Sequence, residues 1–145
     1  MNKVFKVGLI GCGHIAETYF RGHQYFNNFK IVACADINPK AAEKCAKLYN
    51  IKHTTVNEIL KDQNIEVILN LTIPQSHYSV SKRVLNAGKH VYSEKPLATY
   101  FEKGKELVSL AKKKKLYIGN APDTFLGGGG QKARAVSYTH LRAHE

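Results

Sequence analysis

Six residues near the N-terminus, Gly-Cys-Gly-His-Ile-Ala at 11–16, place small side chains at the spacing G-x-G-x-x-A between an apolar run and a helical pattern. Gly11 can take the backbone angles of a tight turn, and Gly13, which has no Cβ, lets a phosphate approach the main chain. Ala16 lets the following helix pack closely on a sheet, and the N–H groups at the start of that helix attract an anion. We therefore predict a dinucleotide-binding turn. Its predicted contacts are Gly11, Cys12, Gly13, His14, Ile15 and Ala16.

Asp36 stands where the second apolar run, residues 29–35, ends. A carboxylate at this place accepts hydrogen bonds from the adenosine ribose hydroxyls of a dinucleotide and repels a 2′-phosphate. No arginine follows at 37–40, so we predict NAD as the cofactor in preference to NADP, with Lys40 as the one residue that argues for NADP. The plainer alternative is that Asp36 is an ordinary turn residue at a strand end. The preceding glycine turn favours the cofactor role.

A sheet must bring these residues together, and the chain alternates short apolar runs with helical patterns throughout. The repeated strand–helix–strand order with short connections predicts a parallel sheet covered on both faces, which is a doubly wound α/β fold of the Rossmann type. The predicted strands are residues 4–10, 29–35, 52–54, 66–72, 90–93 and 116–120.

The helix boundaries follow from capping patterns. Asn38 and Pro39 are a cap and a first-turn proline, and Gly88 is a typical residue after a helix end. Two capping-box patterns, at 55–58 and at 99–102, each predict a helix start. The predicted helices are residues 14–26, 40–49, a short helix after 55–58, 76–87, and a helix from 99–102 to the lysines at 112–115.

The composition is that of one soluble globular domain, because 145 residues with 43% hydrophobic and 23% charged side chains can bury a core. The apolar runs are far shorter than the roughly 20 residues that cross a bilayer. The N-terminus enters the first strand pattern without a cleavage site, so no signal peptide is expected. Three cysteines without a C-x-x-C pair argue against disulfides and zinc. We expect reduced thiols, no metal, no membrane and a cytoplasmic location.

The formal net charge of +11 makes nucleic acid a candidate partner. The basic residues are, however, spread over several predicted helices, and the tight run at 112–115 lies at a helix end, where it complements the helix dipole. No aromatic stripe or nucleic-acid motif accompanies this run. A basic nucleic-acid-binding domain is therefore the least favoured hypothesis, and a general attraction toward an anionic cofactor is another use of the charge.

Two further motifs follow later strands: Thr-Ile-Pro-Gln-Ser-His at 72–77 and Ala-Gly-Lys-His-Val-Tyr-Ser-Glu-Lys-Pro at 87–96. Together with the glycine turn and Asp36, their order and spacing resemble the N-terminal domain of the Gfo/Idh/MocA family of sugar and cyclitol dehydrogenases. The resemblance covers residues 3–134, and Glu-Lys-Pro at 94–96 is its most diagnostic part. It implies an NAD(P)-dependent oxidoreductase that acts on CH–OH groups, with a sugar or polyol substrate and a homo-oligomeric parent enzyme.

The resemblance also implies roles for individual residues. Lys95 is expected beside the reacting carbon, where its ammonium polarises the substrate oxygen and, if the group is buried, relays a proton. Glu94 is expected to orient or tune that region, and Pro96 to fix the turn through a cis peptide. The residues that match the family segment near the nicotinamide side of the cofactor are Thr72, Pro74, Gln75 and His77.

The composition changes after residue 120. We expect residues 1–120 to form the dinucleotide-binding domain, residues 121–135 to be a connector, and residues 136–145 to be a non-native tail. In the connector we predict a flexible hinge at the glycines 127–130 and the start of another helix at 131–135. The second domain, which in the family supplies the substrate pocket and a catalytic histidine, is not recognised. We therefore expect an NAD-binding half of an oxidoreductase that is inactive alone, with a stand-alone NAD-sensing or regulatory module as the second hypothesis.

Overall fold

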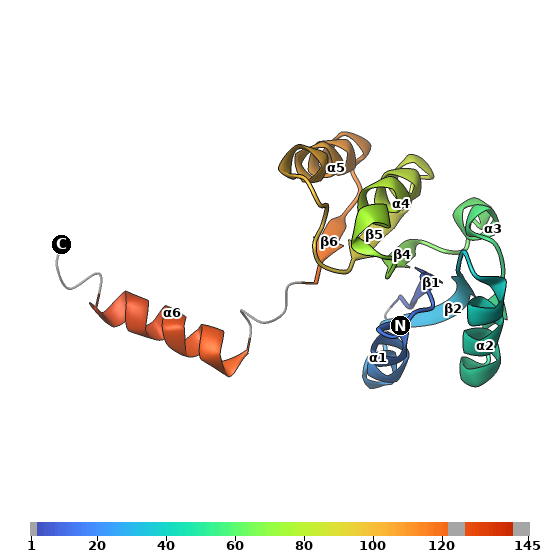
Figure 1. Cartoon of the computed structure of the whole chain (residues 1–145), viewed down its shortest axis with the longest axis horizontal. Helices are drawn as coiled ribbons and strands as arrows, with labels where there is room; N and C mark the ends of the chain where they lie inside the picture. The colour runs from blue at the N-terminus through green and yellow to red at the C-terminus, as the bar shows by residue number, and fades with distance from the viewer. Residues whose placement is uncertain (1–2, 122–126, 141–145) are drawn as a thin grey trace.

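The computed structural model describes residues 3–121 and 127–140, and in these ranges it has the doubly wound α/β architecture expected from the sequence (Figure 1). Six parallel strands form one sheet in the order β3-β2-β1-β4-β5-β6. The strands are β1 (Phe5–Ile10), β2 (Phe29–Ala35), β3 (Lys52–His53), β4 (Val67–Asn70), β5 (His90–Ser93) and β6 (Ile118–Asn120). The helices are α1 (Ala16–Gly22), η1 (His23–Tyr25), α2 (Pro39–Tyr49), α3 (Val56–Lys61), α4 (Pro74–Asn86), α5 (Phe101–Lys114) and α6 (Gly128–His140).

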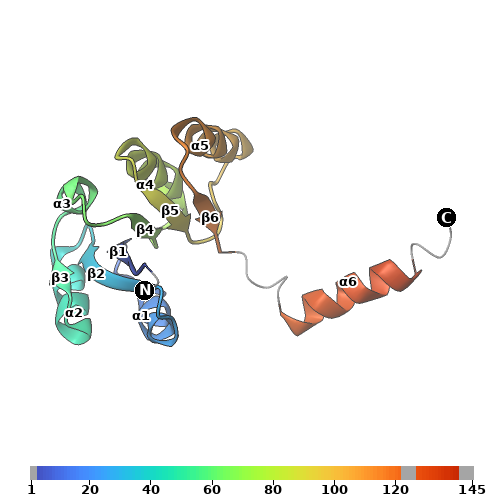
Figure 2. The same ribbon diagram turned by 180° about the vertical axis from the view of Figure 1, so that it is seen from behind.

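Helices cover both faces of the sheet, which is why its strands are apolar on both sides. α1 and α2 lie on one face, and α3, α4 and α5 lie on the other (Figures 1 and 2). On the first face Phe20 of α1 packs with Leu9 of β1 in one buried cluster. On the second face Leu107 of α5 packs with Ile68 of β4 in another. All four side chains are 0% exposed, so the sheet lies between two separate apolar layers.

Several predicted helix boundaries are confirmed, and each has a local cause. The Asn38 side chain accepts a hydrogen bond from a main-chain N–H in the first turn of α2, and Pro39 is the first residue of that helix. Thr55 and Glu58 form the predicted reciprocal capping box at the start of α3. Gly88, with φ +77°, follows the end of α4. These signals act over a few residues and can therefore be recognised in the sequence.

The second predicted capping box is wrong. α5 begins at Phe101, one residue later than the box at 99–102 requires, and its N-cap is Tyr100, for which the described residues show no side-chain capping bond. Leu107 and Ala111 of α5 are 0% and 2% exposed within the core. The helix is therefore stabilised by the burial of its apolar side rather than by a side-chain cap at its start.

The elements α1 and β4 are shorter than predicted. α1 begins at Ala16 rather than at residue 14, because residues 13–15 form a turn that is closed by a 3.1 Å bond from the Ala16 N–H to the Gly13 carbonyl. β4 ends at Asn70 rather than at residue 72. Its end is set by Thr72, whose main-chain N–H turns back to the Asn70 side chain.

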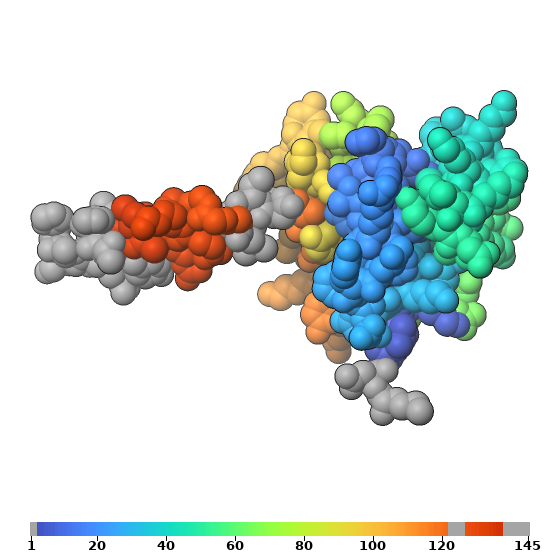
Figure 3. Space-filling model, turned by 90° about the horizontal axis from the view of Figure 1, so that it is seen from below, coloured from blue at the N-terminus to red at the C-terminus, as the bar shows by residue number. Residues whose placement is uncertain are grey.

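The glycines 128–130 were predicted as part of a hinge, but they form the first turn of α6. The Gln131 N–H donates a 3.0 Å bond to the Gly127 carbonyl, four residues back. Glycine is tolerated there because first-turn N–H groups lack intrahelical partners, and good helix formers follow. α6 lies apart from the sheet (Figure 3), and connector residues 122–126 and tail residues 141–145 lie outside the described residues. Over the described ranges, every helix is too short or too polar to cross a membrane.

Candidate dinucleotide-binding site

Four segments that the sequence singled out leave the sheet at the same level of one edge. Ile10, the last residue of β1, is paired with Ala35 of β2 and with Asn70 of β4. Asn70 is in turn paired with Ser93, the last residue of β5. Because the strands are parallel and end together, the glycine turn, Asp36, the segment 72–77 and the segment 94–96 meet at their carboxyl ends. Ligands of doubly wound folds bind at this place.

The glycine turn has one position that must be glycine and one that is open to solvent. Gly11 has φ +102°, and a Cβ there would lie 2.5 Å from both the carbonyl carbon and the oxygen of Leu71. At Gly13, no heavy atom of the described chain lies within 4 Å of the Cβ position. His14 and Ile15 are exposed, whereas Ala16 is fully buried beneath the turn. The main chain at 13–15 is thus accessible to a ligand, while Gly11 and Ala16 hold the turn on the sheet.

Asp36 connects the end of β2 to the glycine turn. Its Oδ2 accepts a 2.6 Å hydrogen bond from the Cys12 N–H, and its Oδ1 accepts a 2.8 Å bond from the Asn38 N–H. The structural role that was the plainer alternative is therefore present. A carboxylate has about four acceptor positions, so Asp36 can also accept bonds from ribose hydroxyls.

Ile37 was missed in the sequence analysis. Its side chain is 100% exposed, directly after Asp36. An apolar residue directly after a strand end can be recognised in the sequence. The exposed Ile37 side chain offers an apolar surface beside Asp36, the predicted ribose acceptor. Such a surface suits the face of a purine ring.

The three cysteines, all within the described residues, are free thiols, as predicted. Cys12 and Cys34 are buried, and Cys45 is partly buried. The pKa of Cys12 is raised above its ordinary value. The larger cause is a hydrogen bond with Cys34, and the second is burial of the thiol. Cys12 therefore stays protonated and adds no negative charge to the turn where a phosphate is expected to bind.

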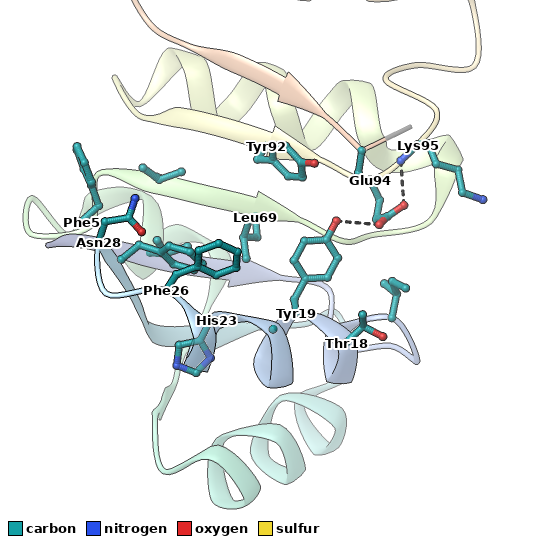
Figure 4. Close-up of a pocket in the computed structure, with 16 residues that line it drawn as sticks. Phe5, Thr18, Tyr19, His23, Phe26, Asn28, Leu69, Tyr92, Glu94 and Lys95 are labelled. Carbon is teal, nitrogen blue, oxygen red and sulfur yellow. Dashed lines mark hydrogen bonds between the residues drawn. The ribbon is translucent and has the colours of Figure 1, made fainter. Parts of the chain in front are cut away.

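A largely apolar cavity of about 670 Å³ lies between α1 and strands β1, β4 and β5, and Glu94 and Lys95 line one end of it (Figure 4). Glu94 Oε1 accepts a 2.8 Å hydrogen bond from the hydroxyl of Tyr19, and Glu94 Oε2 accepts a 3.0 Å bond from the Lys95 N–H. The Lys95 side chain is exposed and extends away from Glu94. The site thus places a fixed carboxylate next to an ammonium group that solvent can reach.

The segment after β4 is organised by Asn70, a second residue that the sequence analysis missed. Asn70 is 0% exposed. Its amide nitrogen donates to the His77 carbonyl (3.0 Å) and the Ser81 hydroxyl (2.9 Å), and its oxygen accepts a 2.7 Å bond from the Thr72 hydroxyl. An amide at the end of an apolar strand is the signal that points to such a network. The network fixes the start of α4, whose first two residues, Pro74 and Gln75, are exposed at the site.

His77 lies in the segment that the resemblance implies, but its side chain is buried. It is 1% exposed, and its ring nitrogens lie 2.8 Å from the Thr72 carbonyl oxygen and 2.5 Å from the Pro96 carbonyl oxygen. Because both nitrogens face the main chain in the interior, His77 joins two loops of the site instead of contacting a ligand. The Lys95–Pro96 peptide is cis.

Comparison with known proteins identifies the family. The profile described as "Oxidoreductase family, NAD-binding Rossmann fold" matches residues 5–121. The chain belongs to the Gfo/Idh/MocA oxidoreductase family. An uncharacterized oxidoreductase of Schizosaccharomyces pombe is 38% identical over 95 residues, which are 63% of this chain and 26% of that protein. An inositol 2-dehydrogenase/D-chiro-inositol 3-dehydrogenase of Lactiplantibacillus plantarum is 30% identical over 114 residues, which are 76% of this chain and 33% of that protein.

Solved structures show the same fold. The WlbA dehydrogenase of Bordetella pertussis, in complex with NADH and UDP-GlcNAcA, matches with a TM-score of 0.86 and 24% identity over 94% of this chain and 41% of that one. Biliverdin reductase of Synechocystis, in complex with biliverdin and NADP+, matches with a TM-score of 0.82 and 27% identity over 90% of this chain and 42% of that one. The chain spans about a quarter to a third of the curated relatives' length.

Proposed function

We propose that this chain is the NAD(H)-binding half of an oxidoreductase that transfers hydride between a nicotinamide cofactor and a CH–OH group of a sugar, cyclitol or related polyol. The observation that carries the proposal is the common level at which β1, β2, β4 and β5 end, since it gathers the glycine turn, Asp36 and Lys95 at one edge. Relatives named as inositol dehydrogenases support the substrate class.

The residues present fit a dinucleotide. The open space at Gly13 leaves the main chain accessible to a pyrophosphate, and the exposed positions 14 and 15 add to that surface. Asp36 would hold the adenosine ribose, and the segments 72–75 and 94–95 would hold the nicotinamide half. The bound nicotinamide would accept or donate the hydride.

We propose NAD rather than NADP because the carboxylate of Asp36 would repel a 2′-phosphate placed next to it. The solved relatives include complexes with NADH and with NADP+, so the family uses both. Lys40, which is exposed four residues after Asp36, is the group that would favour NADP.

Lys95 is the residue for which we propose a catalytic role. An exposed ammonium group can donate a hydrogen bond to a substrate oxygen and stabilise negative charge that develops on it. The described residues leave Lys95 open to solvent, whereas hydride transfer requires a site that orients substrate. Because the chain spans a minor part of its relatives, we propose that it binds the cofactor but does not turn over a polyol alone.

The experiment is a titration of the purified chain with NADH and NADPH, followed by cofactor fluorescence. We expect saturable NADH binding, weaker NADPH binding, and loss of NADH binding in Asp36→Ala. The matched control is Glu102→Ala, which removes an exposed carboxylate from α5 on the other face. A folded wild type that does not bind NADH, or an Asp36→Ala variant that binds like wild type, would contradict the proposal. Turnover of myo-inositol with NAD+ by the chain alone would contradict its inactivity.

A further inference from the structure

Tyr19 joins two segments of the site, α1 and the turn after β5. It lies on α1, three residues after Ala16, and its side chain points across the cavity toward Glu94 (Figure 4). Its hydroxyl donates a 2.8 Å hydrogen bond to Glu94 Oε1. We propose that Tyr19 is a positioning residue that fixes the Glu94–Lys95 turn relative to the glycine turn. This inference rests on the function proposed above.

The bonds to Glu94 divide into two groups. Its main chain is held by neighbouring strands, because its N–H donates to the Asn70 carbonyl (2.9 Å) and its carbonyl accepts from the Asn120 side chain (2.9 Å). Its carboxylate is held by the Tyr19 hydroxyl and by the Lys95 N–H. The sheet therefore fixes where the turn begins, and Tyr19 fixes the carboxylate that orients the Lys95 N–H.

Helix α1, which carries Tyr19, is packed firmly on the sheet. Ala16 and Phe20, on either side of it in the helix, are both 0% exposed. The Phe20 ring stacks on the Tyr49 ring of α2 with 4.0 Å between centroids. These contacts fix the backbone from which the Tyr19 side chain extends, at the helix that begins at the glycine turn. The Tyr19 side chain therefore connects the helix that follows the glycine turn to the Glu94 carboxylate.

The two halves of the site differ in their dependence on this bond. Asp36 directly follows β2 and Glu94 directly follows β5, and these two strands are separated in the sheet by β1 and β4. Loss of the Tyr19 hydroxyl leaves the Glu94 carboxylate with only its bond from the Lys95 N–H among the described bonds, whereas the bonds of Asp36 to Cys12 and Asn38 stay intact. We therefore expect an effect on the nicotinamide half of a bound dinucleotide and little effect on the adenosine half.

The first test compares two ligands in Tyr19→Phe. ADP-ribose contains the adenosine and pyrophosphate of NADH but lacks nicotinamide. We expect the dissociation constant of NADH to rise about 3- to 10-fold, as for the net effect of one ordinary hydrogen bond, and that of ADP-ribose to change less than about twofold. The control is Tyr25→Phe, at a tyrosine that is 86% exposed. Equal losses for both ligands, or no loss for either, would overturn the inference. Wild type that binds neither ligand would instead refute the proposed function.

The second test needs no ligand. Hydrogen exchange at the Lys95 amide, followed by NMR, reports directly on its bond to the Glu94 carboxylate. We expect exchange to be at least several-fold faster in Tyr19→Phe than in wild type or Tyr25→Phe. In a Glu94→Ala background, which has no side-chain acceptor, Tyr19→Phe should add little, because Tyr19 acts on the Lys95 amide through the Glu94 carboxylate. An unchanged exchange rate, or fully additive effects, would overturn the positioning role.

Discussion

Replacing each glycine of the turn by alanine separates stability from binding. In Gly11→Ala, a residue with a Cβ must adopt φ +102°, which costs about 1–3 kcal/mol. The new methyl group also lies 2.5 Å from main-chain atoms of Leu71, so the end of β4 must shift. The 2.8 Å bond from the Leu71 N–H to the Ile10 carbonyl then weakens, at a cost of about 1 kcal/mol. The sum is about 2–4 kcal/mol, or about 5–15 °C in Tm for a domain of this size.

Gly13→Ala is the matched control, because its methyl group meets no described atom within 4 Å. We expect its Tm to lie within about 2 °C of wild type, as for surface substitutions in general. Its NADH affinity should nevertheless fall at least about tenfold, since the methyl group fills the space through which a pyrophosphate reaches the main chain. Thermal unfolding by circular dichroism and NADH titration measure both effects. A wild-type Tm in Gly11→Ala, or wild-type affinity in Gly13→Ala, would refute the reasoning.

Three further predictions follow. In Asp36→Asn, the preference for NADH over NADPH in paired titrations should narrow, because the charge that repels the 2′-phosphate is gone; an unchanged ratio would contradict this. Lys89 is 4% exposed and donates to two main-chain carbonyls, so Lys89→Ala should lose about 2–4 kcal/mol in urea unfolding, and wild-type stability would contradict it. Bonds from Thr54 and Thr55 lower the pKa of Glu58 to about 2, below its usual 4.5. The stability that Glu58 contributes is therefore lost as the pH falls from about 4.5 to about 2. Glu58→Gln should lack this loss in acid titration, and an identical acid profile would argue against it.

The layout of the fold was predictable because its signals are local. Buried parallel strands require near-continuous apolar runs, and β2 has the bounds that its run predicts. The cap at Asn38 and the box at Thr55 also act within one helical turn. Local patterns do not decide every helix end: the box at 99–102 is not used, and α5 begins at Phe101 and is held by the burial of Leu107.

The site was predictable in its position but not in its internal contacts. The glycine turn and Asp36 follow from the chemistry of a phosphate and a ribose at strand ends. The interior position of His77 depends on the carbonyl of Pro96, 19 residues away, and no pattern around His77 announces it. The bond from Tyr19 to Glu94 spans 75 residues and exists only because α1 and β5 border the same cavity.

The central claim is that one edge of the sheet binds NAD, and mapping of amide chemical shifts by NMR during titration with NAD+ tests it most directly. We predict saturable shifts at residues 11–16, at Asp36 and Ile37, and in the segments 72–75 and 94–95, with little change at the lysines 112–115. The claim would be contradicted by a folded chain whose spectrum does not change at saturating NAD+, or by shifts confined to the lysine run.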